Sequence, residues 1–415
     1  MRRSRFLLFV SLLIIILTGT GCITKLPRHT TAPRDQTVIL VSFDGCRHDY
    51  PDSTFTPALD EMAKTGVRAS LQTVFPSKTF PNHLTLVTGL YPAHHGIIAN
   101  TIYDAQNDRW YKLSNGAPTD SSWYHGEPIW ATAERQGIRT ATFFWPGSEA
   151  SFAGYRPTYW REYDGSVPFD ERVSQVLKWL DLPPGERPRF ISLYFEQPDK
   201  SGHAHGPQAA ETLTAVRQVD SQLAKLWEGI KVRHLADGVN VIVVSDHGMT
   251  ALSRDSVIFL DDYINMQDVQ MIDWSPVAAI RPKAHKTDAV YLALKNAHPR
   301  LHVYRKGELP ARYHYNDNAF IQPIIAVADL HWTITTRDYF DKNPKVATGG
   351  THGYDPAYHD MDGIFYAAGP AVKHLKETES FQNLDVYNLM CRILHIKPAQ
   401  NDGDDDISRK ILKSE

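Results

Sequence analysis

The run TVILVSF, from Thr37 to Phe43, constrains the fold of this chain more than any other stretch. Its side chains are mostly apolar and β-branched, which is typical of a strand buried on both faces of a sheet. The strand ends at Asp44, a helix is predicted from Pro57 to about Lys64, and a second strand is predicted from Ala69 to Val74. The chain therefore opens as a β-α-β unit, the building block of parallel sheets.

The same alternation of strands and helices continues along the chain. Further strands of the parallel type are predicted at Thr140 to Phe144, Phe190 to Phe195, Val239 to Ser245 and Ile364 to Ala368. Helices are predicted at Asn82 to Thr88, Asp170 to Leu180, Ala209 to Ile230 and Leu384 to Leu394. This pattern predicts an α/β fold with a mostly parallel central sheet between helices.

Residues from about 273 to 337 depart from that pattern. A helix near Asp288 to Ala297 lies there among short strands such as Leu301 to Tyr304 and Ile324 to Ala328. We interpret this region as a small inserted α+β lobe of one catalytic domain that spans residues 37 to 398. A length of 415 residues with 42% hydrophobic residues suits a large single domain of this kind.

Residues 399 to 415 form a polar stretch with aspartate at positions 402, 404, 405 and 406. Such a cluster suggests calcium, but the glutamate spacing of a calcium-binding loop is missing. The prediction is therefore a solvated polar tail.

The first 22 residues combine a basic start, an apolar run from Phe6 to Leu17, and small residues before Cys22. This order is typical of an export signal, and the apolar run is short for a membrane span, although a retained anchor is the alternative. The small residues resemble a bacterial lipoprotein signal with Cys22 as the lipidated residue, although Gly19 departs from that pattern. Residues 23 to 36 are predicted to be a tether. We therefore expect an exported protein, periplasmic or membrane-anchored as a lipoprotein, that contacts a membrane only through an N-terminal lipid or signal anchor.

The net charge argues against a polynucleotide-binding protein, and the histidine and cysteine content indicates the kind of metal site. The formal net charge is −3 and no long basic run follows the first five residues, so we predict no polynucleotide partner. Nineteen histidines beside three cysteines favour a metal site of histidine and carboxylate ligands. The sequence leaves open whether Cys46 and Cys391 pair, and it leaves the oligomeric state open.

Thr79 is the candidate nucleophile. Pro81 and the predicted helix that stops at Gly89 place its hydroxyl near a helix N-terminus, where backbone N–H groups favour anions such as phosphate. A threonine hydroxyl is a weak nucleophile, so it needs a base or a metal ion to activate it. Taken alone, the stretch also fits a proline-interrupted loop with a capping threonine.

Candidate metal ligands follow three predicted strands. Asp44, Asp199 and the pair Asp246-His247 come after strands whose carboxyl ends would meet at one edge of the sheet. His203 follows Asp199 in a segment that Pro198 and Gly202 predict to be a loop, and His352 lies between glycines. Each residue alone also fits a capping or structural role. Together they supply ligands for two divalent ions.

These motifs carry a resemblance. FDG, KTFPNH, EQPDKSGHAHGP, SDHGM and GGTHGYDP occur in this order in the nucleotide pyrophosphatase/phosphodiesterase family of the alkaline phosphatase superfamily. The match covers about Val38 to Leu394, and we interpret the chain as a bacterial member that lacks the extra domains of the animal ectoenzymes.

The resemblance implies roles for particular residues. One zinc would be held by Asp44, Thr79, Asp246 and His247, and a second by Asp199, His203 and His352, with manganese as an alternative metal. Thr79 would form a covalent intermediate, helped by its backbone N–H and by the side chain of Asn100. Phe80 and Tyr163 would sandwich a nucleotide base, and Tyr194 would line the same pocket. As alternatives, Asn100 is a turn residue and the aromatic residues belong to the core.

We therefore predict a two-zinc phosphodiesterase that cleaves nucleotide phosphodiester or pyrophosphate bonds and releases nucleoside 5′-monophosphates. Some relatives cleave choline phosphodiesters or lysophospholipids, and the sequence does not exclude those substrates. A phosphomonoesterase of the same superfamily would carry an additional arginine and a third metal site, and a sulfatase would carry Cys or Ser in place of Thr79. A binding protein without catalysis is the remaining alternative, and the complete set of ligands argues against it.

Overall fold

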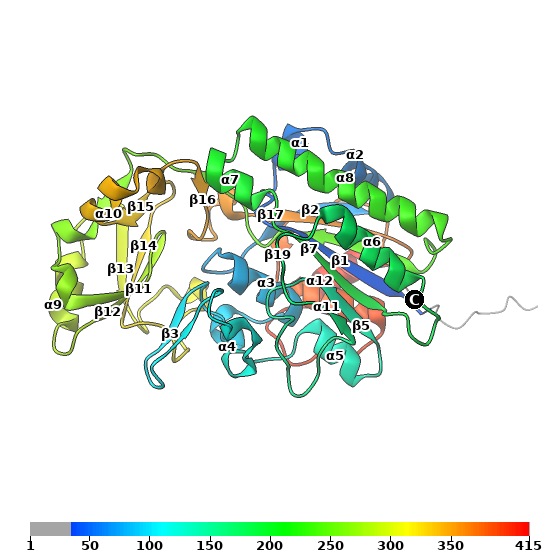
Figure 1. The fold of residues 1–415 in the computed structure, drawn as a ribbon, viewed down its shortest axis with the longest axis horizontal. Helices are drawn as coiled ribbons and strands as arrows, with labels where there is room; N and C mark the ends of the chain where they lie inside the picture. Colours follow the sequence, from blue (N-terminus) through cyan, green and yellow to red (C-terminus); the bar gives the residue numbers. More distant parts are fainter. Residues whose placement is uncertain (1–34, 415) are drawn as a thin grey trace, which may run out of the picture. The chain divides into compact units, whose positions relative to one another are not determined.

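A nine-stranded sheet forms the centre of the computed structural model, which describes residues 35 to 414 (Figure 1). The predicted signal and tether therefore lie outside the described residues, apart from the last two positions of the tether. In spatial order the main path of the sheet is β18 (Lys376–Glu377), β2 (Val67–Gln72), β17 (Gly363–Ala368), β8 (Val239–Val244), β1 (Thr37–Phe43), β7 (Phe190–Phe195), β5 (Thr140–Phe143) and β6 (Tyr159–Trp160). The ninth strand, β19 (Phe381–Gln382), pairs with β2.

Strand β1 lies between two parallel partners, β7 and β8, and all of its residues are buried. Strands β5 and β6 extend the parallel arrangement beyond β7. The predicted α/β fold with a mostly parallel sheet is confirmed. The predicted parallel direction of β17 is wrong, because this strand runs antiparallel to both β8 and β2. Its apolar run indicated burial correctly, but the chain enters β17 from loops at the carboxyl ends of the parallel strands and must run back.

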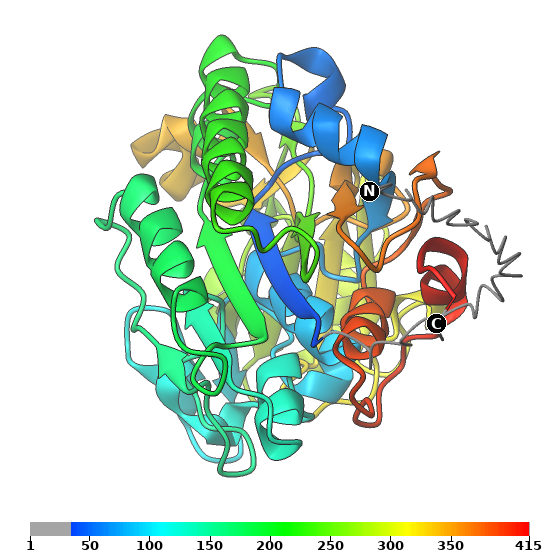
Figure 2. The same cartoon turned by 90° about the vertical axis from the view of Figure 1, so that its right-hand side faces the viewer.

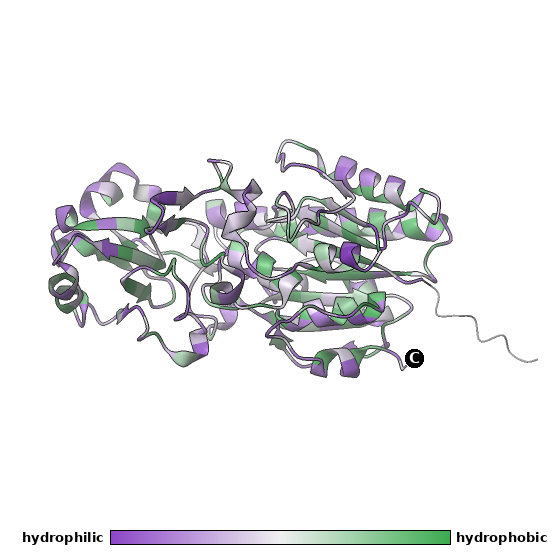
Figure 3. Ribbon diagram, turned by 90° about the horizontal axis from the view of Figure 1, so that it is seen from below, coloured by the Kyte–Doolittle hydropathy of each residue, from purple (hydrophilic) through white to green (hydrophobic). Residues whose placement is uncertain are grey.

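Helices cover both faces of the sheet, and alternate residues of β1 serve the two layers (Figure 2). Ile39 and Val41 belong to the core beneath α2 (Pro57–Thr65), α6 (Phe169–Leu180) and α8 (Ala210–Val232). Val38 and Leu40 belong to the core beneath α3 (Thr79–Thr88), α5 (Ile129–Arg135) and α11 (Asp385–Leu394). Figure 3 shows this pattern as hydrophobic strands between helices with hydrophilic outer faces.

A smaller lobe has its own core and its own four-stranded antiparallel sheet. The strands lie in the order β11 (Val269–Asp273), β12 (Val277–Pro282), β14 (Ile324–Ala328) and β13 (Leu301–Arg305). Helix α9 (Thr287–Leu294) packs on this sheet, while β10 (Val257–Phe259), β15 (Thr333–Thr335) and α10 (Arg337–Lys342) complete the lobe. The predicted α+β character of the insertion is confirmed.

Several short elements connect the larger ones. They are α1 (Tyr50–Ser53), α4 (Pro92–His95), β3 (Ile102–Asp104), β4 (Arg109–Tyr111), α7 (Asp199–His205), β9 (Thr250–Ala251), β16 (Gly350–Thr351) and α12 (Asp406–Ile411). Helix α12 differs from the solvated tail that the polar composition predicted, because Ile407 and Ile411 are buried on one face. Two apolar residues four apart are enough to give a short helix a packing face.

The two cysteines in the described residues are free and buried. Cys46 belongs to the core on one face of the sheet and Cys391 to the core on the other face. They do not form a disulfide in this structure. Among residues 35 to 414, the structure contains no helix with the length and apolar character needed to cross a bilayer.

Candidate active site

Three acidic residues meet at the carboxyl ends of adjacent strands. Asp44 follows β1, Asp246 follows β8, and Asp199 begins α7 shortly after β7. Parallel pairing of β1 with β7 and β8 places these ends side by side, as the sequence predicted. The predicted loop around His203 is wrong. This segment forms the short helix α7, whose spacing brings Asp199 and His203 onto one face.

Thr79 is the first residue of α3, which ends with Gly89 in the left-handed conformation. The loop before it is held by Asn82, whose side chain accepts a hydrogen bond from the Val74 N–H and donates to the carbonyl groups of Pro76 and Lys78. Thr79 Oγ1 lies 3.2 Å from Nε2 of His247. The helix start and the loop clamp therefore direct the hydroxyl toward the acidic cluster.

Three histidines are oriented by backbone carbonyl groups. Nδ1 of His203, His247 and His352 lies 2.8 to 2.9 Å from the carbonyl oxygens of Gly350, Gly248 and Ser77, respectively. A carbonyl oxygen only accepts, so each Nδ1 carries the proton. The Nε2 atoms then face the carboxylates, with His247 Nε2 3.0 Å from Asp246 Oδ2 and His203 Nε2 3.3 Å from Asp199 Oδ1. Histidines that ligate metals are usually oriented by this type of second hydrogen bond.

Each of the three carboxylates has one buried oxygen without a hydrogen-bond donor. Asp44 Oδ1, Asp199 Oδ1 and Asp246 Oδ2 are buried atoms with no hydrogen-bond partner. Burial, reinforced by the charges of Asp246 and Asp199, raises the pKa of Asp44 well above its ordinary value. Uncompensated buried carboxylates are costly, and divalent cations would satisfy them. This donor set fits the cations that the sequence predicted.

The shifted pKa values of His247 and His352 also fit binding of divalent cations. Burial lowers the pKa of His247, but the charge of Asp246 outweighs it and raises this pKa to about 10. A proton and a metal ion therefore compete for the Nε2 position of His247. Burial, with the neighbouring His247, lowers the pKa of His352 well below its ordinary value, which leaves its Nε2 as a lone pair.

The potential ligand atoms fall into three groups, in each of which all atoms lie within 4.8 Å of one another. They are Asp199, His203 and His352; Asp44, Asp199 and His247; and Asp44, His83 and Asp246. The structure thus brings together the predicted ligands of both sites. The rings of His247 and His352 stack with their centroids 3.4 Å apart, which places the two groups next to each other.

His83 was missed by sequence reasoning. It is fully buried, and its Nδ1 lies 2.9 Å from the Thr79 carbonyl oxygen and 3.2 Å from Asp246 Oδ2. Both partners only accept, so Nδ1 carries a proton and cannot bind a metal. Its Nε2 lies 2.8 Å from the Ser42 hydroxyl, which can donate to it. Its position four residues after Thr79 on a helix was the available sequence signal.

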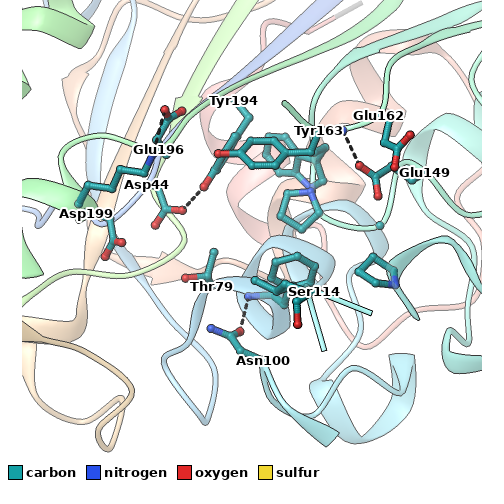
Figure 4. A pocket seen from close by; sticks show the side chains of 17 residues that line it. Asp44, Thr79, Asn100, Ser114, Glu149, Glu162, Tyr163, Tyr194, Glu196 and Asp199 are labelled. Carbon is teal, nitrogen blue, oxygen red and sulfur yellow. Dashed lines mark hydrogen bonds and ion pairs between the residues drawn. The ribbon is translucent and has the colours of Figure 1, made fainter. Parts of the chain in front are cut away.

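A pocket of about 570 Å³ opens beside Thr79 (Figure 4). Its lining includes all four predicted substrate-binding residues: Phe80, Asn100, Tyr163 and Tyr194. It also includes Trp145 and three carboxylates that sequence reasoning did not single out: Glu149, Glu162 and Glu196. Two predicted metal ligands, Asp44 and Asp199, line it as well. The pocket therefore joins aromatic walls to the acidic cluster.

Asn100 and Tyr194 occupy defined positions in this pocket. The amide oxygen of Asn100 accepts a hydrogen bond from the Phe80 N–H at 3.0 Å, which leaves its NH₂ group as a free donor. The Tyr194 hydroxyl donates to Asp44 Oδ2 at 2.5 Å. Tyr194 is thus fixed against a candidate metal ligand, whereas Tyr163 is 46% exposed and is available for contact with a ligand.

Comparison with known proteins gives the family. The model of the type I phosphodiesterase / nucleotide pyrophosphatase family matches residues 38 to 355. The chain belongs to this family. The match contains every candidate site residue.

Relatives with curated descriptions include a venom phosphodiesterase of Crotalus durissus collilineatus, which is 39% identical over 389 residues. Ectonucleotide pyrophosphatase/phosphodiesterase family member 3 of Rattus norvegicus is 38% identical over 389 residues. Each alignment covers 91% of this chain, but only 46% and 44% of the two relatives. The chain thus spans about half the length of the curated relatives that it matches.

Solved structures of the family share the fold over their whole length. Murine ectonucleotide pyrophosphatase/phosphodiesterase 5, as an inactive threonine-to-alanine variant in complex with AMP, is 38% identical with a TM-score of 0.87. The human protein of the same name is 39% identical with the same TM-score. Both comparisons cover 91% of this chain and 100% of the other. The alkaline-phosphatase-like fold is thereby shown.

Proposed function

We propose that this family member hydrolyses nucleotide phosphodiester and pyrophosphate bonds and releases nucleoside 5′-monophosphates through a covalent intermediate on Thr79. One observation carries the proposal. The Thr79 hydroxyl lies 3.2 Å from His247 Nε2, between the predicted cation ligands and an aromatic pocket. A nucleophile in that position can attack a phosphorus atom whose nucleoside occupies the pocket.

The chain's own residues suit two divalent cations. We assign Asp44, Thr79, Asp246 and His247 to one cation and Asp199, His203 and His352 to the other, with zinc as the proposed metal and manganese as the alternative. When bound, such ions lower the pKa of a coordinated hydroxyl and stabilise the charge on phosphoryl oxygens. Histidine and carboxylate ligands together favour zinc over magnesium or calcium.

Thr79 would attack the phosphorus atom and displace the leaving group in line, and water would then attack the phosphothreonine. Two displacements give net retention of configuration at phosphorus. The free NH₂ group of Asn100 and the backbone N–H groups at the start of α3 supply donors to the phosphoryl oxygens. None of these donors has to reorganise during the reaction.

Phe80 and Tyr163 would hold the base between their rings. Both line the pocket, and aromatic faces bind bases through stacking. The Tyr194 hydroxyl would position Asp44. The AMP complex of the murine family member 5 and the names of the venom phosphodiesterases support a nucleotide substrate.

For the location of the protein, we propose export through the N-terminal signal of a bacterium. Residues 1 to 22 carry the basic, apolar and small-residue order that supports it, and Cys22 would be the lipidated residue. Palmitate labelling of the chain and of a Cys22→Ser variant tests the lipid. Equal labelling of both would contradict it.

The activity is tested with three chromogenic esters: p-nitrophenyl thymidine 5′-monophosphate, p-nitrophenyl phosphate and p-nitrophenyl phosphorylcholine. We expect the nucleotide diester to be hydrolysed with the highest kcat/KM, and we expect EDTA to abolish the activity and zinc to restore it. Preference for the phosphate monoester or the choline ester would contradict the proposed substrate. Lack of turnover of all three esters would contradict catalysis.

A further inference from the structure

Lys200 is the basic residue of an otherwise acidic pocket. Among residues 35 to 414, the lining of this pocket includes five carboxylates and a single basic side chain, that of Lys200. Figure 4 shows Glu196 and Asp199 at the end of the pocket opposite to Glu149 and Glu162. Lys200 follows Asp199 directly on α7 and forms an ion pair with Glu196. The positive charge of the pocket therefore belongs to the Asp199 end.

Glu196 has a stronger partner than Lys200. Arg172 is fully buried, and its Nη1 donates to Glu196 Oε2 at 2.7 Å and to the Tyr194 carbonyl oxygen at 2.9 Å. Burial raises the pKa of Glu196, but the hydrogen bond and the charge of Arg172 outweigh burial and lower this pKa. Glu196 therefore keeps a partner for its charge when Lys200 moves away.

Lys200 is held loosely by comparison. Its Nζ lies 3.3 Å from Glu196 Oε1, and its side chain is 58% exposed. Exposed ion pairs of this kind add little to stability, and the lysine side chain is flexible. Lys200 can therefore exchange Glu196 for an anion in the pocket at small cost.

The leaving group of the proposed reaction would emerge beside α7. An in-line displacement places the leaving oxygen opposite to the attacking oxygen. Thr79 Oγ1 lies beside His247, in the first ligand group. Where two ligand groups flank a phosphate, one serves the attacking oxygen and the other serves the leaving oxygen. The second group contains Asp199 and His203 of α7, so the leaving group would face the helix that carries Lys200.

We propose that Lys200 forms a subsite for the leaving group and makes the enzyme favour leaving groups that carry phosphate, such as the pyrophosphate of a nucleoside triphosphate, over alcohols. This inference rests on the proposed function and refines it. A lysine ammonium group offers three donors and a full positive charge to phosphate oxygens. Carboxylates, which make up the rest of the charged lining, offer neither.

The test compares two substrates that share a nucleotide and differ in the leaving group: ATP and p-nitrophenyl adenosine 5′-monophosphate. With the zinc-loaded protein, we expect Lys200→Gln to lower kcat/KM for ATP by about fivefold and to leave that of the p-nitrophenyl ester unchanged. Lys200→Arg keeps the charge and should retain most of the activity toward ATP. Lys178→Gln, on the exposed side of α6 and outside the pocket lining, is the matched control.

Binding gives a second readout that is independent of turnover. In the Thr79→Ala background, calorimetry should show that Lys200→Gln weakens the binding of ATP about fivefold and leaves the binding of AMP unchanged. The difference for ATP should shrink at high salt, because salt screens an exposed charge.

Equal losses for ATP and the p-nitrophenyl ester would overturn the inference, because Lys200 would then act on the nucleotide part or on the fold. Unchanged kcat/KM for ATP in Lys200→Gln, or equal impairment in Lys200→Arg and Lys200→Gln, would also overturn it. Lack of turnover of both substrates by the parent protein would instead contradict the proposed function itself.

Discussion

Two ends of Thr79 are held by two different histidines. The hydroxyl lies beside His247 Nε2, and the carbonyl oxygen accepts from the Nδ1–H of His83. His83 Nδ1 also lies 3.2 Å from Asp246, which neighbours His247 in the chain. The proposed nucleophile, a candidate ligand and a buried histidine therefore form one connected unit at the scale of single residues.

Thr79→Ala removes the proposed nucleophile but leaves six of the seven proposed ligands. We expect the turnover of p-nitrophenyl thymidine 5′-monophosphate to fall by at least ~10³-fold, because no other hydroxyl replaces the lost one. Metal analysis should still find both ions. The exposed Thr65→Ala variant serves as the control, and near wild-type turnover of Thr79→Ala would refute the assignment of the nucleophile.

His83→Ala should lower kcat by about 10- to 100-fold, since outer partners of metal ligands typically contribute that much. His83→Asn restores a donor near the position of Nδ1, so we expect it to recover much of kcat and of the zinc affinity. His95 is also fully buried but bonds to Pro81 and Thr85, and His95→Asn controls for the loss of a buried ring. Equal impairment of His83→Ala and His83→Asn would indicate that only the volume of the ring matters.

At the scale of helices and strands, short elements supply and orient the candidate ligands of the second cation group. Helix α7 carries Asp199 and His203, and β16 supplies the carbonyl of Gly350 that orients His203. The lobe also reaches this region, because Asp273 at the end of β11 forms an ion pair with Lys78, the residue before Thr79. The second cation group thus depends on elements of only a few residues.

His203→Ala should reduce the bound zinc from two ions to one, since it removes one of three proposed ligands. Release of the covalent intermediate is expected to slow more than its formation, which rapid-quench measurements with a labelled nucleotide would resolve. His205→Ala is the matched control, because His205 is exposed on the same helix and belongs to none of the ligand groups. Two equivalents of zinc in His203→Ala would contradict the assignment of this ligand.

The sequence predicted the central strands well, because β1, β7 and β8 are continuous apolar runs whose burial depends on composition alone. It also predicted Asp44, Asp199 and Asp246 at one edge, because parallel pairing brings strand ends together. It did not predict the direction of β17, which depends on where the chain returns from distant loops. Nor did it predict helix α7 or the role of His83, because contacts with Gly350, Ser42 and Asp246 determine them.

Charge at the start of α11 influences the stability of the whole domain. Burial raises the pKa of Asp385, at the start of α11, to about 6, and the charges of Asp404, Asp406 and Asp405 add to the shift. The folded state therefore holds a proton more tightly than the unfolded state, whose carboxyl has a pKa near 3.8. Stability should rise as the pH falls from above 6 toward 4 for this group.

Asp385→Asn should stabilise the protein at pH 7.5 on the order of 1 kcal/mol, once solvent screening is taken into account. The gain should shrink at pH 5, where the carboxyl of the parent chain is largely protonated. Urea denaturation at both pH values measures the difference. Asp255→Asn, on an exposed loop, controls for the change in net charge, and an equal gain at both pH values would contradict the linkage.

The order of the site residues along the chain has a consequence for biosynthesis. Asp44 follows the first strand of the sheet, whereas His352 comes just before β17, one of the last long strands. A chain that is still emerging holds only part of each proposed cation group, and contacts between such distant residues form late in folding. Capture of the proposed cations would therefore report that synthesis has passed His352, and chains that stop before His352 would lack the second proposed group and the stability that a bound ion would add.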